Sequence, residues 1–336
     1  MTLSTPTPIP LSATRGSLMG GTARVLAGRY RLGEPIGIGG MGCVYAALDL
    51  EYGREVALKG LTNTACTPAN RRRLHREAEA VSLIRHRSVC EVYDLDHHRG
   101  SPFIVMERLR GETLRDRLRD IGALSSDDAI AIAFQVLDGL GAAHGMGFLH
   151  RDVKPGNIFI TSPRGATPKV KLIDFGLARR LPALARVDDL ITDPDMIPGT
   201  PSYMAPEQLA ASPDLDGRVD IWAAGLVLYE MLIGRRAFER GSPIDMVRKI
   251  CGENPPPPSS LRCDLPQKID AVIACAIEKD RRARFPSTGH MHAALLDACV
   301  RHYASEIRQL APTRKFRPEA LTLADGDESS DISVSA

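Results

Sequence analysis

The sequence predicts an α+β protein in two parts: a small antiparallel β domain that carries one helix, and a larger, mainly helical domain. Two observations support this division. Between Tyr30 and about Leu61, the strand-like runs YRLGEPIG, CVYAALDL and REVALKGL are separated by the turn-forming segments GIGGMG and EYG. After Gly111 the chain is mostly helical to about His302. We expect the link between the two parts at about 107–111.

The remaining elements of the small domain follow its third strand. The stretch RRRLHREAEAVSLIR (71–85) has an apolar stripe at helical spacing, and two further strands are expected at 89–96 and 103–109. In the large domain Ser125 lies three residues before Asp128, a variant of the capping box that begins a long apolar helix.

Short strands and both chain ends complete the expected organisation. The runs NIFI (157–160) and KVKLID (169–174) are strand-like. The Ser-, Thr- and Pro-rich residues 1–28 and the acidic, serine-rich residues 311–336 lack the composition of a core. We therefore expect flexible ends around a folded region at 29–310.

Composition narrows the functional classes. Of 336 residues 43% are hydrophobic, and Lys plus Arg outnumber Asp plus Glu by only 43 to 41. This balance gives no global field that would attract nucleic acid or an anionic membrane. No apolar run approaches the ~20 residues of a membrane span, and the N-terminus lacks the pattern of a signal peptide. The seven cysteines show no CxxC pair or zinc spacing, so we expect reduced thiols and a cytoplasmic protein.

A glycine-rich segment lies between the first two expected strands. Gly37, Gly39 and Gly42 form a G-x-G-x-x-G pattern, which is weak evidence alone. The dinucleotide-binding version requires a helix after the glycines, whereas CVYAALDL is strand-like. Two interpretations remain: an ordinary glycine-rich hairpin turn, or a β-hairpin whose backbone amides close over the phosphates of a nucleotide.

The third strand ends in VALK (56–59). A strand lysine is commonly a solvated surface residue, but an inward Lys59 would carry its cation to the α- and β-phosphates and would require a carboxylate partner. The following helix offers two candidates. Glu77 lies on the apolar stripe that continues through Val81, so we choose it as the partner, whereas Glu79 is expected to face solvent.

The stretch HRDVKPGNIFI (150–160) is the most specific in the chain. Asp152 can accept the proton of an attacking hydroxyl, Lys154 can stabilise a transferring γ-phosphoryl group, and Asn157 can hold a metal ion. Asp174 begins a later Asp-Phe-Gly triplet and could chelate magnesium at the β- and γ-phosphates. The triplet alone is uninformative, but its position after the first motif gives it weight.

In this order GxGxxGxV, VALK, HRDxxxxN, DFG and APE (205–207) resemble the protein-kinase signature set. The segments GGMGCVY, HRDVKPGN and GTPSYMAPEQ resemble those of bacterial Hanks-type Ser/Thr kinases, and the resemblance extends from about Tyr30 to His302. The resemblance implies a two-lobed protein-kinase fold and transfer of the γ-phosphoryl group of ATP to Ser or Thr hydroxyls of proteins. It also implies Mg²⁺, for which Mn²⁺ can substitute.

The resemblance assigns further residues to the nucleotide. Met106 matches the gatekeeper position, and the backbone of Glu107 and Leu109 would bond to adenine. Arg108 stands where an aromatic residue is frequent. Val44, Ala57 and Phe159 would form an apolar clamp on the base. Ile36, directly before the glycine loop, is a further expected nucleotide contact.

The resemblance also implies supporting contacts in the large lobe. Glu207 and Arg284 match a buried ion pair that supports the substrate-docking region. Asp220 matches the residue that anchors the catalytic loop.

The acidic stretch VDDLITDPDMIPGT (187–200) lies between the DFG and APE motifs, which makes it the activation segment. Thr200 resembles the docking-loop threonine. Thr192 is the better phosphorylation site, with Arg151 as the cation that would receive its phosphate. The surrounding acids leave an alternative open, in which they mimic a phosphate and activity is constitutive.

Three functional classes follow: an active Ser/Thr protein kinase, a catalytically dead scaffold, and a phosphotransferase for small molecules. A dead scaffold is disfavoured because the catalytic set is intact in the sequence: Lys59, Glu77, Asp152, Asn157 and Asp174. A phosphotransferase for small molecules is disfavoured by the presence of the protein-docking segment GTPSYMAPE. We expect protein substrates as partners, with no nucleic acid and no membrane segment. Relatives often dimerise through the small lobe, so a homodimer is a further expectation.

Overall fold

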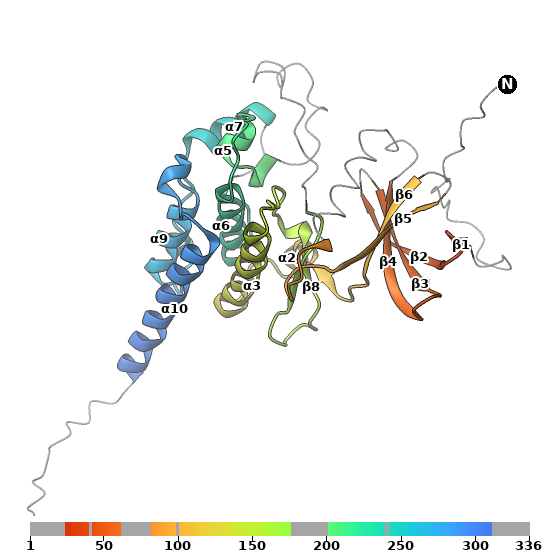
Figure 1. Cartoon of the computed structure of the whole chain (residues 1–336). Helices are drawn as coiled ribbons and strands as arrows, with labels where there is room; N and C mark the ends of the chain where they lie inside the picture. The colour runs from red at the N-terminus through yellow and green to blue at the C-terminus, as the bar shows by residue number, and fades with distance from the viewer. Residues whose placement is uncertain are drawn as a thin grey trace, which may run out of the picture.

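The computed structural model describes residues 24–39, 42–61, 82–98, 101–175, 201–238 and 242–310. Figure 1 shows a β-sheet on one side and a group of helices on the other, with α2 and β8 between them. The arrangement confirms the predicted two-lobed α+β fold.

The small lobe is a six-stranded antiparallel sheet with the order β1-β2-β3-β4-β6-β5. The three predicted strand runs form the meander β2-β3-β4, because glycine-containing turns separate them. The strand bounds are β1 (Val25–Leu26), β2 (Tyr30–Gly39), β3 (Gly42–Asp49), β4 (Arg54–Leu61), β5 (Val92–His98) and β6 (Ser101–Glu107). One face buries an apolar cluster of Leu26, Tyr30, Ala47, Val56, Leu58, Phe103 and Val105.

The sheet begins earlier than expected. β1 lies within residues 1–28, which were predicted to be a flexible arm, and pairs with β2 through Val25 opposite Arg31 and Leu26 opposite Tyr30. Leu26 is 5% exposed, so burial of one apolar side chain joins this segment to the sheet. The predicted helix at 71–85 lies almost wholly outside the described residues.

A second, three-stranded sheet of order β7-β8-β9 belongs to the large lobe. Its strands are β7 (Glu112–Thr113), β8 (Ile158–Ile160) and β9 (Val170–Leu172). The predicted strands at 157–160 and 169–174 are therefore present and shorter. Asn157 belongs instead to a 3₁₀ turn, η1 (Pro155–Asn157), which leads from the HRD motif (150–152) into β8.

Helices make up the rest of the large lobe. Ser125 caps α3 by accepting a hydrogen bond from the N–H of Asp128 at 3.1 Å, which confirms the predicted start. The helix at 221–229 is buried as expected, since α6 packs against α3 and α9. No helix among the described residues is long and apolar enough to cross a membrane. The helical bounds are α2 (Leu114–Ile121), α3 (Ser126–Gly145), η3 (Pro201–Tyr203), α5 (Pro206–Leu209), α6 (Arg218–Ile233), α7 (Pro243–Gly252), α8 (Pro258–Leu261), α9 (Gln267–Ala276), η4 (Arg281–Ala283) and α10 (Thr288–Leu310).

Candidate active site

The loop between α3 and β8 brings three predicted residues into contact. Nζ of Lys154 lies 2.7 Å from Oδ2 of Asp152. Nδ2 of Asn157 donates to the carbonyl oxygen of Asp152 at 2.8 Å and to its Oδ2 at 3.0 Å. The side chains of Asp152 and Lys154 are 34% and 33% exposed, so the carboxylate is oriented and still open to a substrate.

Asp220 holds this loop from the first turn of α6. Its carboxylate accepts the backbone N–H groups of His150 at 2.8 Å and Arg151 at 2.7 Å, which confirms the predicted anchoring role. Nε2 of His144 lies 2.8 Å from Oδ2 of Asp220. Burial alone would raise the pKa of Asp220, but the hydrogen bond from His144 and the further contributions of His144 and His150 together outweigh it, so the pKa is lowered. Sequence reasoning missed His144, although a polar residue in the last turn of an apolar helix was a usable signal.

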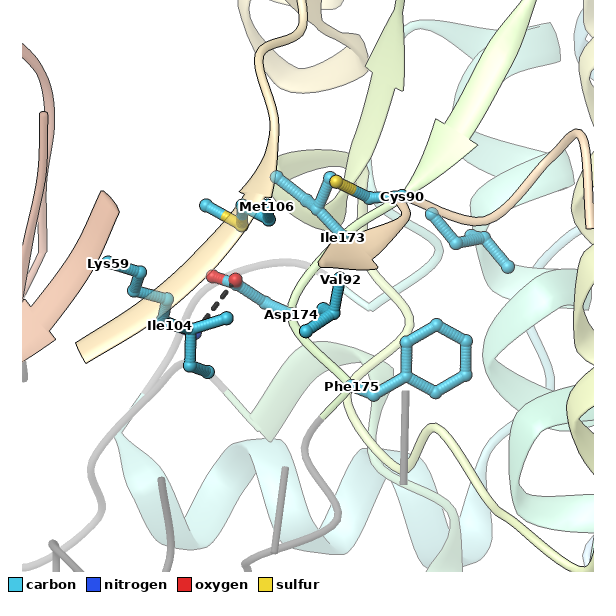
Figure 2. A pocket seen from close by; sticks show the side chains of 9 residues that line it. Lys59, Cys90, Val92, Ile104, Met106, Ile173, Asp174 and Phe175 are labelled. Carbon is cyan, nitrogen blue, oxygen red and sulfur yellow. Dashed lines mark hydrogen bonds and ion pairs between the residues drawn. The ribbon is translucent and has the colours of Figure 1, made fainter. Parts of the chain in front are cut away.

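Lys59 extends from β4 towards the large lobe. Its Nζ lies 2.8 Å from Oδ1 of Asp174, and Figure 2 shows the two side chains facing each other across the pocket. Desolvation by itself would raise the pKa of Asp174, but the charge and hydrogen bond of Lys59, together with His150 and Lys154, outweigh it, so the pKa lies below its ordinary value. Lys59 therefore points inward, as its interpretation as a contact to nucleotide phosphates requires, and not outward as a solvated surface lysine would. Its predicted partner Glu77 lies outside the described residues, and that pairing stays a prediction.

The pocket around this pair lies between the two lobes. Three of its lining residues, Lys59, Met106 and Asp174, were predicted. Ile104 could have been found, because alternate residues of a strand share a face and it lies two residues before Met106. The other lining residues depend on how distant segments pack, and they are Cys90, Val92, Leu172, Ile173 and Phe175.

The glycine segment forms a hairpin between β2 and β3, as both interpretations of the segment required, and phosphate binding by its amides stays a prediction. Gly37 pairs with Val44, and Gly39 pairs with Gly42. The turn residues 40–41 lie outside the described residues. Ile36 is 45% exposed at the edge of this hairpin.

The remaining clamp residues lie on neighbouring strands. Val44 is opposite Lys59 in the β3–β4 pairing, and Ala57 is opposite Met106 in the β4–β6 pairing. Phe159 lies on β8 in the other lobe. The predicted clamp residues therefore come from the sheets of both lobes.

The link after β6 carries the predicted adenine contacts of Glu107 and Leu109. Arg108, which stands where an aromatic residue is frequent, forms an ion pair with β4: its Nη1 lies 2.9 Å from Oε1 of Glu55. Arg110 binds the other oxygen of Glu55 at 2.7 Å. This departure from the common pattern therefore has a structural role in tying the link to the sheet.

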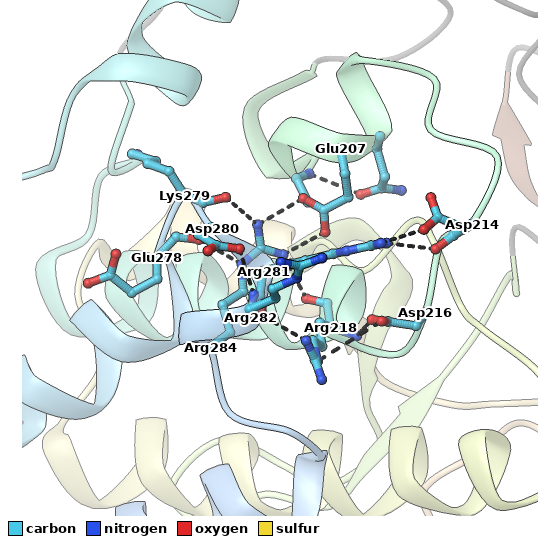
Figure 3. A network of polar contacts seen from close by, with 12 residues as sticks. Glu207, Asp214, Asp216, Arg218, Glu278, Lys279, Asp280, Arg281, Arg282 and Arg284 are labelled. Carbon is cyan, nitrogen blue, oxygen red and sulfur yellow. Dashed lines mark hydrogen bonds and ion pairs between the residues drawn. The ribbon is translucent and has the colours of Figure 1, made fainter.

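The predicted Glu207–Arg284 pair is present and buried. Nη1 and Nη2 of Arg284 lie 2.6 and 2.8 Å from the two carboxylate oxygens of Glu207, a bidentate geometry. The side chains are 0% and 10% exposed, and the guanidinium lies over the ring of Trp222. Figure 3 shows Arg284 at the centre of a network that joins α5 to the segment after α9.

The predicted metal ligands are Asn157 and Asp174. They are brought near each other because the N–H of Ile173 donates to the carbonyl of Asn157 at 3.0 Å. Both offer oxygen donors, which Mg²⁺ prefers, and Mg²⁺ is usually held by one or two carboxylates together with phosphates and waters. Within the described ranges no group of three or more His, Cys, Asp or Glu could hold a metal by itself. The donor set therefore fits a magnesium ion that a nucleotide phosphate helps to bind.

Comparison with known proteins agrees with this geometry. The protein kinase domain family matches residues 30–296. The chain is 38% identical over 308 residues to a probable serine/threonine-protein kinase, CE0033, of Corynebacterium efficiens, covering 89% of this chain and 45% of the relative. It is 39% identical to a probable serine/threonine-protein kinase PknB of Corynebacterium glutamicum, covering 81% and 42%. It is 37% identical to the serine/threonine-protein kinase PknB of Mycobacterium tuberculosis, covering 81% and 43%.

The chain thus spans less than half the length of these relatives. The match includes every motif from the glycine hairpin to Arg284. The chain belongs to the protein kinase family, in its bacterial serine/threonine-kinase branch.

Proposed function

We propose that this chain is an ATP-dependent protein kinase that phosphorylates Ser and Thr hydroxyls of proteins, including its own activation segment. The observation that carries the proposal is the contact of Asp152 with both Lys154 and Asn157. A carboxylate held in this way, and still partly exposed, can orient an acceptor hydroxyl and take its proton.

The chain's own residues divide the work of phosphoryl transfer. Asp152 directs the hydroxyl and accepts its proton, while the Lys154 ammonium, 2.7 Å from that carboxylate, stabilises charge on the transferring group. Asn157 keeps Asp152 in place and, with Asp174, would hold magnesium. Bound Mg²⁺, or Mn²⁺ in its place, would neutralise phosphate charge. Most of the rate gain then comes from positioning and electrostatics.

Nucleotide binding is assigned to the space between the lobes. Lys59 would contact the α- and β-phosphates and Glu77 would hold it there. The backbone of Gly37, Gly39 and Gly42 would cover the phosphates. The adenine contacts are assigned to Ile36, Val44, Ala57, Met106, Glu107, Leu109 and Phe159.

A protein substrate is favoured over a small molecule by the Glu207–Arg284 pair. Glu207 is the last residue of the predicted docking segment GTPSYMAPE (199–207) and lies in α5, so the pair holds the end of that segment in place; a small acceptor would need no such support. The described members of the catalytic set, Lys59, Asp152, Asn157 and Asp174, contact one another in two groups, which disfavours a dead scaffold.

The activation segment is the proposed site of regulation. Thr192 and Thr200 lie outside the described residues. Arg151 is the proposed cation that binds the phosphate on Thr192, because its Nε is buried and has no hydrogen-bond partner among the described residues. We expect Thr192→Ala to lower activity by preventing phosphorylation, measured as the initial rate of phosphate transfer. Undiminished activity in that variant would favour constitutive activity maintained by the neighbouring acids.

A homodimer through the small lobe is the proposed assembly. Val25, Leu50 and Tyr52 are 38%, 41% and 63% exposed, and the N–H of Leu50 donates to Arg29, which follows β1. The β3–β4 turn that carries Leu50 and Tyr52 therefore lies beside the β1–β2 turn. Light scattering on the purified chain tests this assembly, and a monomer mass over micromolar concentrations contradicts it.

The function is tested with labelled ATP, Mg²⁺ and a generic basic protein. We expect label on the protein substrate and on the chain, and Asp152→Ala should abolish both while retaining nucleotide binding. Binding of Mg-ATP by the unaltered chain without any labelling would show that the proposed function is wrong.

A further inference from the structure

A charged pair lies behind the link between the lobes. Nζ of Lys171, in β9, is 2.8 Å from Oε2 of Glu107, the last residue of β6. The two side chains are 20% and 28% exposed, so water and salt screen this pair less than a surface pair. Because β9 belongs to the large-lobe sheet and β6 to the small-lobe sheet, one ion pair joins the two lobes.

Glu107 is held at several points. Its N–H donates to the carbonyl of Glu91 at 2.8 Å, and its Oε2 also accepts the N–H of Glu91 at 3.4 Å. Its carbonyl receives a weak S–H bond from Cys90 at 3.9 Å, which leaves acceptor capacity for a ligand. The side chain and the backbone of Glu107 are thus oriented together.

Lys171 contacts or pairs with segments on both sides of the proposed base site. Its Nζ also donates to the carbonyl of Val89 at 3.3 Å, so it holds the segment that leads to β5. Its backbone lies opposite Phe159 in the β8–β9 pairing. Phe159 is the proposed floor under the base, and Glu107 is the proposed edge contact.

We infer that Lys171 is a positioning residue for the nucleotide base, because it sets the spacing between the link at Glu107 and the floor at Phe159. The inference rests on the proposed function, since it concerns the same nucleotide site. It adds a residue that contacts neither the phosphates nor the catalytic loop. Loss of its cation leaves the Glu107 carboxylate partly buried without its ion-pair partner, and the link is free to shift.

The test is Lys171→Met, with ATP binding measured by calorimetry and steady-state kinetics measured over a range of ATP concentrations. We expect the Kd and the KM for ATP to rise about 3- to 10-fold, the size of one lost hydrogen bond of ordinary strength. The kcat at saturating ATP should stay within about twofold, because Asp152 is not displaced. The preference for ATP over GTP should fall, because the edge of the base is no longer read at a fixed position.

Two variants of similar size serve as controls. Lys171→Arg keeps the cation and should restore the KM and the nucleotide preference. Lys169→Met removes the same charge from an exposed position two residues earlier and should match the unaltered chain. In the double variant Lys171→Met/Glu107→Gln, the loss should not exceed that of the more affected single variant, because the two residues act as one unit.

The inference is overturned if Lys171→Met keeps its KM and its preference for ATP, or if only kcat or the melting temperature falls. Failure of the proposed function gives a different result. In that case the unaltered chain itself neither binds ATP nor transfers phosphate.

Discussion

Replacing Arg284 by Met should destabilise the large lobe strongly. The guanidinium is 0% exposed and forms a bidentate pair with Glu207, whose side chain is 10% exposed. It also donates to the carbonyl oxygens of Arg218, Glu278 and Lys279. Met fills much of the volume but leaves the Glu207 carboxylate buried without its partner.

The size of the effect follows from that unpaired charge. Breaking a buried ion pair by removing one partner costs about 3–5 kcal/mol. For a domain of this size each kcal/mol lowers the melting temperature by about 2–4 °C, so we expect a fall of about 6–20 °C. The double variant Arg284→Met/Glu207→Gln should recover part of the loss, because it removes the stranded charge.

Differential scanning calorimetry measures the change, and Arg282→Met is the matched control. Arg282 is exposed and lies two residues away, so its replacement should shift the melting temperature by less than about 2 °C. A fall of less than about 2 °C in Arg284→Met would refute the assignment of a large stabilising role to the pair. Recovery of nothing in the double variant would show that packing against Trp222, and not charge, dominates.

Two other variants test the catalytic loop and the acid response. In Gly217→Ala the new Cβ would lie 2.8 Å from Cε1 and Nδ1 of His144, so the ring must move away from Asp220. We expect kcat to fall about 3- to 10-fold in steady-state assays, because Asp220 holds the catalytic loop. An unchanged kcat would show that His144 does not affect the catalytic loop through Asp220. The hydrogen bond from Arg164 lowers the pKa of Glu112 from 4.5 to about 2, so the ionised carboxylate stabilises the fold above pH 4.5 and loses that contribution as the pH falls towards 2. The difference in urea midpoint between the unaltered chain and Glu112→Gln should therefore shrink below about pH 4.5, and a difference independent of pH would contradict the ionic role.

Sequence reasoning was most successful where function depends on neighbours in the chain. Asp152, Lys154 and Asn157 lie within one short loop, so their spacing and the following 3₁₀ turn are enough to bring them together. The hairpin of β2 and β3 was predictable for the same reason, because glycines and strand-forming residues act locally. Boundaries were less accurate, since β1 joins the sheet only through a long-range pairing with β2.

By itself the sequence determined the order of the motifs, the two-lobed α+β architecture and the residue types that phosphoryl transfer requires. Only the tertiary structure decided which distant groups meet: Lys59 with Asp174, His144 with Asp220, and Lys171 with Glu107. The physical reason is that such contacts join elements far apart in the chain. Their geometry depends on how helices and sheets pack, and local propensity carries no information about that packing.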